Sequence, residues 1–502
     1  MCAPAGLHAN RQGRSSASTP RGRTRGCAPT EAAGVVGRLL PVLLALCLLS
    51  ACAAGKPDDP GLIEEPMTRE TMDALFTEDV QWWRGYKDPD LVRYLDLALE
   101  RNVDLARSAV RIHQALTRAE QAGADLFPTA SADGSFSARR ALKTGEVSHS
   151  YGVNVLGLSY EVDLWRRLRE AKNAAEWEHR ATAADRESVR LSLLHSVVNG
   201  YFNLRYVLEA RLLVGQNIRR YQSILSLART KVDLGKSAPV EAHQAEQALL
   251  AAENQLRGLN ADEAALRQTL ADLLNCRAEA LPPLALDSLL DQKNLPPDLS
   301  VPVSALAARP DLMAAEARFA GAFSDLQSAR ASWYPRLTLN GLFGLSASRS
   351  EDILKLPFVN GGIGLSLPFL DWPRIRAQVK LSEDEYELAR LDFVDAMTKA
   401  LNEVWAAYRA SEESARSLAL VRERLKHEQA VSAHYEARYR LGAAELKDWL
   451  EALNSEDSTR QSVLQAKYQM LKDESVIYRA MGGRFLPKAG EEAKEPQRQK
   501  RP

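Results

Sequence analysis

The chain has 502 residues, too long for one ordinary globular core, so we expect several domains or an extended shape. Hydrophobic residues make up 45% of it, charged residues 26% and aromatic residues only 7%, a composition that suits long packed helices. The formal net charge is zero. Without a basic excess we expect no nucleic acid as a partner.

The N-terminus carries the features of an export signal. Six arginines precede a short apolar run, Leu39–Leu49, whereas a membrane-spanning helix needs about 20 apolar residues. The run leads into LSAC (49–52), which resembles the bacterial lipoprotein box. We therefore predict a lipoprotein signal peptide at 1–51 and lipidation of Cys52; the alternative is an ordinary signal peptide with an incidental cysteine. Ala53, where inner-membrane lipoproteins carry Asp, implies the outer membrane.

Residues 52–87 are interpreted as a lipidated linker and a surface segment that contains Trp82 and Trp83. One helical pattern then runs from Pro89 to Asp125, since Gly and Pro are absent from it until Gly123. Long helices are predicted at 164–234 and 240–275. A segment with five prolines follows and places an inter-repeat linker at 284–300.

Two stretches show the period-2 alternation of β-strands, and they predict β-hairpins at 127–163 and 334–371. In the second hairpin the apolar positions alternate with small or polar ones; they are Leu337, Leu339, Gly341, Phe343, Ile363, Leu365, Leu367 and Phe369. After it, Pro373 fits the first turn of a helix. Neither Gly nor Pro occurs from Arg374 to Leu441, so one helix could extend about 100 Å, provided that neighbours support it throughout.

The chain is an internal repeat whose two copies superpose when the numbering is shifted by 207. The repeat units lie at 88–283 and 301–483, and a disordered tail is expected at 484–502. The offset superposes Arg111 on Arg318, Pro128 on Pro335, Gly134 on Gly341, Phe136 on Phe343, Trp165 on Trp372 and Gly235 on Gly442. Positions 198–205 fit better at an offset of 204, so we expect a small length change inside the repeat.

Each predicted strand is long enough to cross a bilayer when tilted, and its alternation suits a transmembrane barrel wall. Four strands cannot close a barrel, and lipid tolerates no open sheet edge. We therefore expect an oligomer that shares one barrel. The alternative is a soluble β-sandwich patch that caps the helices.

Several motifs in order resemble the outer-membrane efflux channel family, and more closely its lipoprotein branch that serves resistance-nodulation-division pumps. They are RPDL (309–312), FPTASADG (127–134), YPRLTLNG (334–341) and LSYEVDLWRRLR (158–169). The resemblance implies a mainly α fold with a transmembrane β-barrel: a homotrimer with a 12-stranded barrel and an α-helical tunnel. It further implies a passive exit duct for small molecules in the outer membrane, with a periplasmic adaptor and an inner-membrane pump as partners. A type I protein secretion duct and a structural coiled-coil lipoprotein are the alternatives.

No catalytic constellation, metal-ligand spacing or cofactor fingerprint is found in the sequence, so we predict neither an enzyme nor a cofactor. The resemblance makes Asp448, Glu451 and Tyr439 candidates for a periplasmic gate. Asp448 and Glu451 share a helix face at this spacing, and three copies would form a ring that attracts cations. The alternative is a solvated helix face. Gly235 and Gly442 precede the two helix-tip turns and are predicted C-caps, near which family members meet their adaptors.

Overall fold

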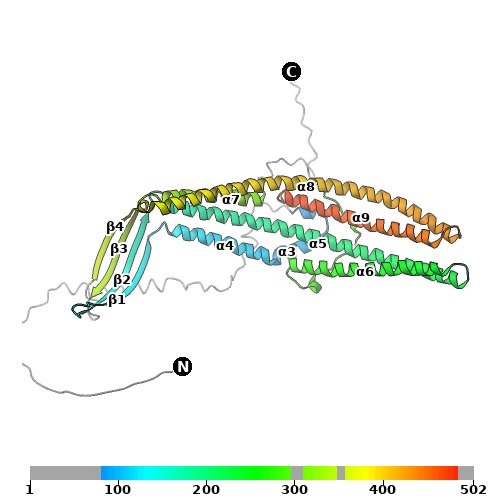
Figure 1. The fold of residues 1–502 in the computed structure, drawn as a ribbon, viewed down its shortest axis with the longest axis horizontal. Coiled ribbons are helices and arrows are strands. Elements are labelled where there is room, and N and C mark those ends of the chain that lie inside the picture. Colours follow the sequence, from blue (N-terminus) through cyan, green and yellow to red (C-terminus); the bar gives the residue numbers. More distant parts are fainter. Residues whose placement is uncertain (1–80, 286, 296–308, 348–356, 484–502) are drawn as a thin grey trace, which may run out of the picture. The chain divides into compact units, whose positions relative to one another are not determined.

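The computed structural model describes residues 81–285, 287–295, 309–347 and 357–483, all of which belong to one compact unit, Phe76–Pro502. Helices dominate this unit, and its strands gather at one end of them (Figure 1). The predicted combination of mainly helix with a few strands is confirmed. The signal peptide at 1–51, the lipidation site Cys52 and the tail at 484–502 lie outside the described residues.

The structure repeats itself with the predicted offset. The first repeat consists of α4 (Val103–Ala124), β1 (Thr129–Arg140), β2 (Val147–Val162), α5 (Arg167–Asp233) and α6 (Pro239–Leu273). The second consists of α7 (Pro310–Ala331), β3 (Arg336–Ala347), β4 (Pro357–Ser366), α8 (Trp372–Arg440) and α9 (Leu446–Ala480). The predicted offset relates both ends of α4 to those of α7, both ends of β1 to those of β3, and both ends of α6 to those of α9. The duplication is therefore confirmed element by element.

The long helices α5 and α8 are uninterrupted. Their last residues are related by the predicted offset, and α6 and α9 keep it. The expected length change around positions 198–205 is therefore wrong as a net insertion or deletion. The prediction of one long helix after the second hairpin is confirmed, with Pro373 in its first turn, where a missing N–H leaves no helical bond unmade.

The single helix predicted from Pro89 to Asp125 is wrong, because it consists of α3 (Pro89–Arg101) and α4. Asn102 between them is extended, and its side-chain oxygen accepts the backbone N–H groups of Asp104 and Leu105 at 3.0 Å each. Its side-chain amide donates to the Leu273 carbonyl at the end of α6 (2.9 Å). A side chain that accepts hydrogen bonds from the first free N–H groups of a helix marks the start of that helix. Asn102, a residue type favoured at this position, was therefore the sequence feature that could have predicted the break.

Trp82 and Trp83 are not at the surface, so the interpretation of 52–87 as a linker and surface segment is wrong at its C-terminal end. Both belong to the 3-10 helix η1 (Trp82–Tyr86), and each is 1% exposed. Trp82 stacks on Tyr478 of α9 with ring centroids 4.7 Å apart, and Tyr86 packs edge-on against Phe202 of α5. Burial of these large rings joins the start of the described chain to both repeats.

The four strands form one antiparallel sheet in the order β1-β2-β3-β4, so the pairing of β2 with β3 joins the two repeats. Near the helices the registers of the two hairpins follow the offset: Ala130 pairs with Leu158, and Leu337 pairs with Leu365. Beyond a register shift after Ser131 they differ by one residue, because Gly134 pairs with Val153 whereas Gly341 pairs with Gly361. Within the described sheet, β1 and β4 are the edge strands.

Residues paired directly across strands share one face of the sheet, and the register gathers apolar side chains of all four strands on one face. Phe136, Leu158, Leu339 and Ile363 represent the strands on it. The other face is mostly small and polar, with Leu342 and Phe358 as departures. A register shift in β2 between Asn154 and Leu156 is a β-bulge, which keeps both Val153 and Leu156 on the apolar face. In the single chain this face is uncovered: Phe136 is 61% and Ile363 75% exposed.

Candidate functional site at the helix turns

Two helix turns lie at the end of the helices opposite the sheet (Figure 1). The turn from α5 to α6 contains Gly235 (φ 67°), and the turn from α8 to α9 contains Gly442 (φ 74°). The N–H groups of Gly442 and Ala443 donate to carbonyls of the last turn of α8 (3.1 and 2.8 Å), and those of Gly235 and Lys236 do the same for α5 (2.9 and 2.8 Å). This pair of bonds around a left-handed residue is a Schellman motif, which glycine adopts without a Cβ clash.

A buried cluster joins all four helices behind these turns. Tyr439 of α8 stacks on Trp449 of α9, with ring centroids 5.3 Å apart. The other buried members are Tyr221, Ile224, Leu225 and Ala228 from α5, Ala245 and Ala252 from α6, and Leu446, Leu450 and Leu453 from α9. The cluster holds the two helical hairpins of one chain together at their tips.

Tyr439 also makes polar contacts with both helices of the first repeat. Its hydroxyl donates to Glu241 Oε2 of α6 (3.2 Å), and the ammonium of Lys231 on α5 lies 3.7 Å from its ring centroid. Burial, followed by the charge of Glu241, raises the pKa of Tyr439 to about 12. The hydroxyl therefore stays protonated and continues to donate, and the cation over the ring adds a second attraction.

The two acidic gate candidates lie on the first turns of α9. Asp448 is half-buried in the first turn, where the helix dipole stabilises a negative charge. Glu451 is exposed and pairs with Lys447 of the same helix (3.7 Å). Among the described contacts, neither carboxylate bonds to Tyr439. The structure therefore brings these three candidates to one region without joining them directly.

Sequence reasoning missed Glu241 and Lys231, the polar partners of Tyr439. The offset carried a signal for both, because it superposes Glu241 on Asp448 and Lys231 on Arg438. Glu241 thus occupies in α6 the first-turn position that Asp448 occupies in α9.

A second polar cluster surrounds the described part of the inter-repeat segment. Glu474 of α9 is 1% exposed, and its Oε2 accepts the Leu295 N–H (3.0 Å) and the Tyr86 hydroxyl (3.4 Å). Burial raises the pKa of Glu474 to about 7. Lys467, which precedes it on the same face of α9, donates to the Gln292 carbonyl (2.6 Å). These bonds fasten the predicted linker to α9, so its described residues are part of the core.

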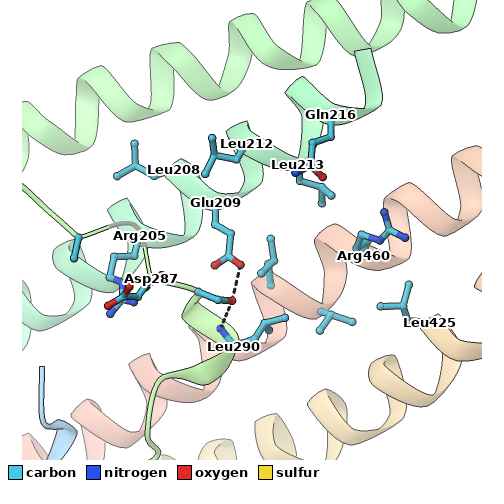
Figure 2. Close-up of a pocket in the computed structure, with 14 residues that line it drawn as sticks. Arg205, Leu208, Glu209, Leu212, Leu213, Gln216, Asp287, Leu290, Leu425 and Arg460 are labelled. Atoms are coloured by element: carbon cyan, nitrogen blue, oxygen red, sulfur yellow. Dashed lines mark hydrogen bonds between the residues drawn. The ribbon is translucent and has the colours of Figure 1, made fainter. Parts of the chain in front are cut away.

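The same segment is fastened to α5 beside a surface cavity of about 310 Å³ (Figure 2). Glu209 accepts the Ser288 hydroxyl (2.8 Å) and the Leu289 N–H (2.7 Å). Arg205 donates to the Asp287 carbonyl (2.9 Å) and pairs with the buried Asp88 (2.6 Å). The polar groups on this wall of the cavity therefore hold the segment in place.

Within the described ranges, no group of three or more His, Cys, Asp or Glu side chains could hold a metal ion. Among the helices that the structure describes, none combines the length and the apolar character of a membrane-spanning segment.

Comparison with known proteins finds similarity along most of the chain. The pattern of the family described as "Outer membrane efflux protein" matches residues 94–276 and 301–483, two segments that are again related by the offset of the repeat. The chain is 35% identical to "Toxin and drug export protein A" of Aggregatibacter actinomycetemcomitans over 410 residues, covering 81% of this chain and 89% of that protein. It is 30% identical to the pyoverdine export outer membrane protein OpmQ of Pseudomonas putida over 461 residues, 89% of this chain and 96% of that protein. The solved open state of the Neisseria gonorrhoeae MtrE outer membrane channel matches with a TM-score of 0.72 and 25% identity, over 82% of this chain and 94% of that chain.

Proposed function

The chain belongs to the outer membrane efflux protein family, and from this premise we propose that it is the passive, gated exit duct of a tripartite efflux system. Its place is the outer membrane, like that of its relatives. Small molecules would pass through the duct across the periplasm and the outer membrane. One observation carries the proposal: a four-stranded sheet with an apolar face and two edge strands.

The sheet suits one third of a transmembrane barrel. Its apolar face would meet lipid and its small and polar face would line the lumen, as in barrels of this kind. Edge strands leave backbone groups unpaired, which hydrocarbon does not tolerate, and single-chain barrels begin at about eight strands. A homotrimer joins three four-stranded sheets into a closed barrel of twelve strands.

The helices support the same assembly, because, like the sheet, they end in two outer surfaces. We call these surfaces the two borders of the chain: one is formed by α4 and α6 and the other by α8. In the described chain α4 and α6 pack on α5, whereas α8 packs on α7 and α9. The outer surfaces of both borders expose apolar side chains, among them Leu116, Leu250, Leu388 and Trp405. Neighbouring copies in a trimer would cover these side chains and close an α-helical tunnel.

The N-terminal part would anchor the duct. We expect residues 1–51 to be removed and Cys52 to carry the lipid, followed by the two repeats at 88–283 and 301–483. Lipid chains alone hold weakly, so the barrel would supply the rest of the membrane attachment. Labelling with radioactive palmitate tests this: the native chain should incorporate it, a Cys52→Ala variant should not, and equal incorporation by both would contradict the assignment.

The partners expected for such a duct are a periplasmic adaptor and an inner-membrane pump, since the sequence offers no catalytic constellation to supply energy. The relatives' names mention drugs and pyoverdine, which favours small molecules as cargo. One of those names also mentions a toxin, which keeps export of a protein through a type I secretion system as the second candidate.

Fractionation and deletion test the function together. The protein should be recovered from the outer membrane as a trimer, and a deletion strain should become more sensitive to dyes and antibiotics. A deletion strain that keeps its resistance but loses a secreted protein would favour type I secretion. Recovery only as an inner-membrane monomer would contradict the channel itself.

We place the periplasmic gate at the helix turns. Tyr439 ties α8 to α6 through Glu241 within one chain, with a bond of 3.2 Å. Asp448 and Glu451 would form a ring of six carboxylates around the axis of a trimer. In this gate the tyrosine contacts hold the tips together, and the carboxylates attract cations to the constriction. The turns at Gly235 and Gly442 would give the adaptor its contact surface.

Single-channel recording in planar bilayers tests both parts. Asp448→Ala/Glu451→Ala should change the conductance and weaken block by divalent cations, whereas unchanged conductance and block would exclude these residues from the gate. Tyr439→Phe keeps the ring and removes one hydrogen bond worth about 1 kcal/mol, so the channel should open more often. Tyr435→Phe, in the same helix and partly buried against the tip cluster, is the matched control and should leave opening unchanged.

A further inference from the structure

We propose that neighbouring copies of this chain meet through the same contacts that its two repeats make with each other. The inference rests on the proposed oligomeric channel and names its interface residue by residue. Within one chain, the structure shows how the first repeat contacts the second. Each residue of this contact can be replaced by its counterpart in the other repeat, 207 positions away. The result is a contact between the second repeat of one copy and the first repeat of the next.

The sheet supplies the first part of this interface. Within the chain, Leu158 of β2 pairs with Gly341 of β3, and Leu156 pairs with Phe343. The offset converts these pairs into Leu365 with Gly134 and Ile363 with Phe136, which join β4 of one copy to β1 of the next. Gly134, Phe136, Ile363 and Leu365 all lie on the apolar face of the sheet within one chain, so the transfer keeps the apolar side chains on one face.

A tryptophan below the sheet supplies the second part. Trp165 of the first repeat donates from Nε1 to the Pro335 carbonyl of the second (2.9 Å) and stacks on Tyr334 with ring centroids 4.7 Å apart. The offset turns these residues into Trp372, Pro128 and Phe127. The tryptophan that donates, the proline whose carbonyl accepts and the aromatic ring that stacks are thus all present a second time, with Trp372 on one border of the chain and Pro128 and Phe127 on the other. In the single chain Trp372 is 55% and Phe127 69% exposed.

An ion triad between helices supplies the third part. Arg318 of α7 pairs with Asp185 of α5 (Nη1 to Oδ1, 3.3 Å) and with Glu178 of α5 (Nε to Oε2, 3.6 Å). The offset converts this triad into Arg111 of α4 with Asp392 and Glu385 of α8. All three residue types are retained, and all three side chains are exposed in the single chain. An arginine on one border therefore faces two carboxylates placed on the other.

These three contacts belong to the sheet and to the helices next to it. Near the helix turns the transfer fails: Arg220 and Tyr221 of α5 bond to Asp457 of α9, but the offset gives His427 and Glu428 opposite Leu250. A head-to-tail interface of this kind uses two different surfaces of each copy, and it closes into a ring when the rotation fits.

Disulfide cross-linking of the full-length protein in outer membranes tests the register. The background carries Cys276→Ala, which removes the free cysteine in the described part of the chain. Gly134→Cys with Leu365→Cys should give covalent dimers and larger multiples after oxidation and heat denaturation. Gly134 accepts a side chain, because nothing lies within 4 Å of an added Cβ. In one chain β2 and β3 separate these two positions, so a disulfide has to join two copies.

Two matched variants define the outcomes. Ala130→Cys with Leu365→Cys lies on the same face, about 13 Å further along β1, and should cross-link much less. Leu158→Cys with Gly341→Cys should form the disulfide inside one chain without any covalent dimer. If the protein is a trimer in detergent but Gly134→Cys/Leu365→Cys does not cross-link, or Ala130→Cys/Leu365→Cys does so instead, the interface is wrong and the channel still stands. A monomer in detergent would contradict the channel first.

Charge reversal provides an independent readout of the triad. Arg111→Asp should lower the temperature at which the trimer dissociates, and adding Asp392→Arg in the same chain should restore it. Arg318→Asp is the matched change at the contact within the chain. It should lower the free energy of unfolding, and adding Asp185→Arg should restore that free energy. An unchanged dissociation temperature in Arg111→Asp, or a loss that Asp392→Arg does not reduce, would exclude the triad from the interface.

Discussion

Next to the sheet the two repeats carry the same contact residues, whereas near the helix turns they carry different ones. Trp165 and Arg318 have Trp372 and Arg111 as counterparts under the offset of the repeat. Tyr439 and Trp449, which hold the helix turns together, correspond in the first repeat to Val232 and Ala242, neither of which is aromatic. Around the inter-repeat segment even the charge is inverted, because Arg267 occupies the position of Glu474.

We attribute this difference to the number of contacts that one set of residues serves in each region. In the proposed ring the sheet end closes one type of contact twice, once inside the chain and once between copies, so a single set of residues serves both. At the turns, Tyr439 and its partner Glu241 tie two hairpins of the same chain. The proposed gate would have to release there, so the contact within a chain and the contact between chains would need different strengths.

Trp449→Ala should produce the largest effect, because it removes the ring on which the asymmetric tip depends. Truncation of a buried aromatic side chain costs about 3–5 kcal/mol. Hydrogen exchange of the amides at 436–453 should accelerate strongly, since local opening becomes cheaper, while the sheet end stays protected. Leu441→Ala, at an exposed residue of the same turn, is the control. Equal acceleration in both variants would mean that the tip cluster does not stabilise the turns.

Glu474→Gln should remove a pH dependence that arises at a position where the first repeat carries Arg267. The pKa of Glu474 is raised to about 7 in the folded chain from the ordinary 4.5, so the folded state binds the proton more tightly. The resulting stabilisation is complete below pH 4.5 and is lost as the pH rises through 7. It amounts to roughly 3 kcal/mol.

Urea unfolding in detergent at pH 5 and pH 8 measures this effect. The native chain should lose more stability between these values than Glu474→Gln, whose amide oxygen can still accept the Leu295 N–H. Glu413→Gln changes an exposed carboxylate of α8 and should keep the native pH dependence. The assignment fails if Glu474→Gln keeps it as well.

Arg318→Ala and Arg111→Ala should have the smallest effects and sharpen the comparison most directly. Exposed ion pairs contribute about 0.2–1 kcal/mol. Arg318→Ala removes a pair within the chain, so it should lower the free energy of unfolding. Arg111→Ala should leave that quantity nearly unchanged and lower only the dissociation temperature of the trimer. The same response in both variants would argue against equivalent roles for the two arginines.

The sequence alone determined the duplication, both hairpins and the long helices, because these depend on local periodicity and on where Gly and Pro are absent. The glycines at the helix turns belong to the same class, since a left-handed residue after a helix favours glycine whatever surrounds it. The resemblance to the family made Asp448 and Glu451 gate candidates, and this stays a prediction; the bond between Tyr439 and Glu241 could not be predicted at all. Those residues are 198 positions apart, and only helix packing brings them together.

Tertiary structure likewise decided the place of Trp82 and Trp83, since a short polar-flanked segment shows no periodicity that reveals the rings it will meet. It decided the break at Asn102, where the cap also bonds to α6. It also decided the order of the four strands and the bulge in β2. A period-2 pattern states which residues share a face of one strand, but only pairing with the other strands fixes which faces join into one surface.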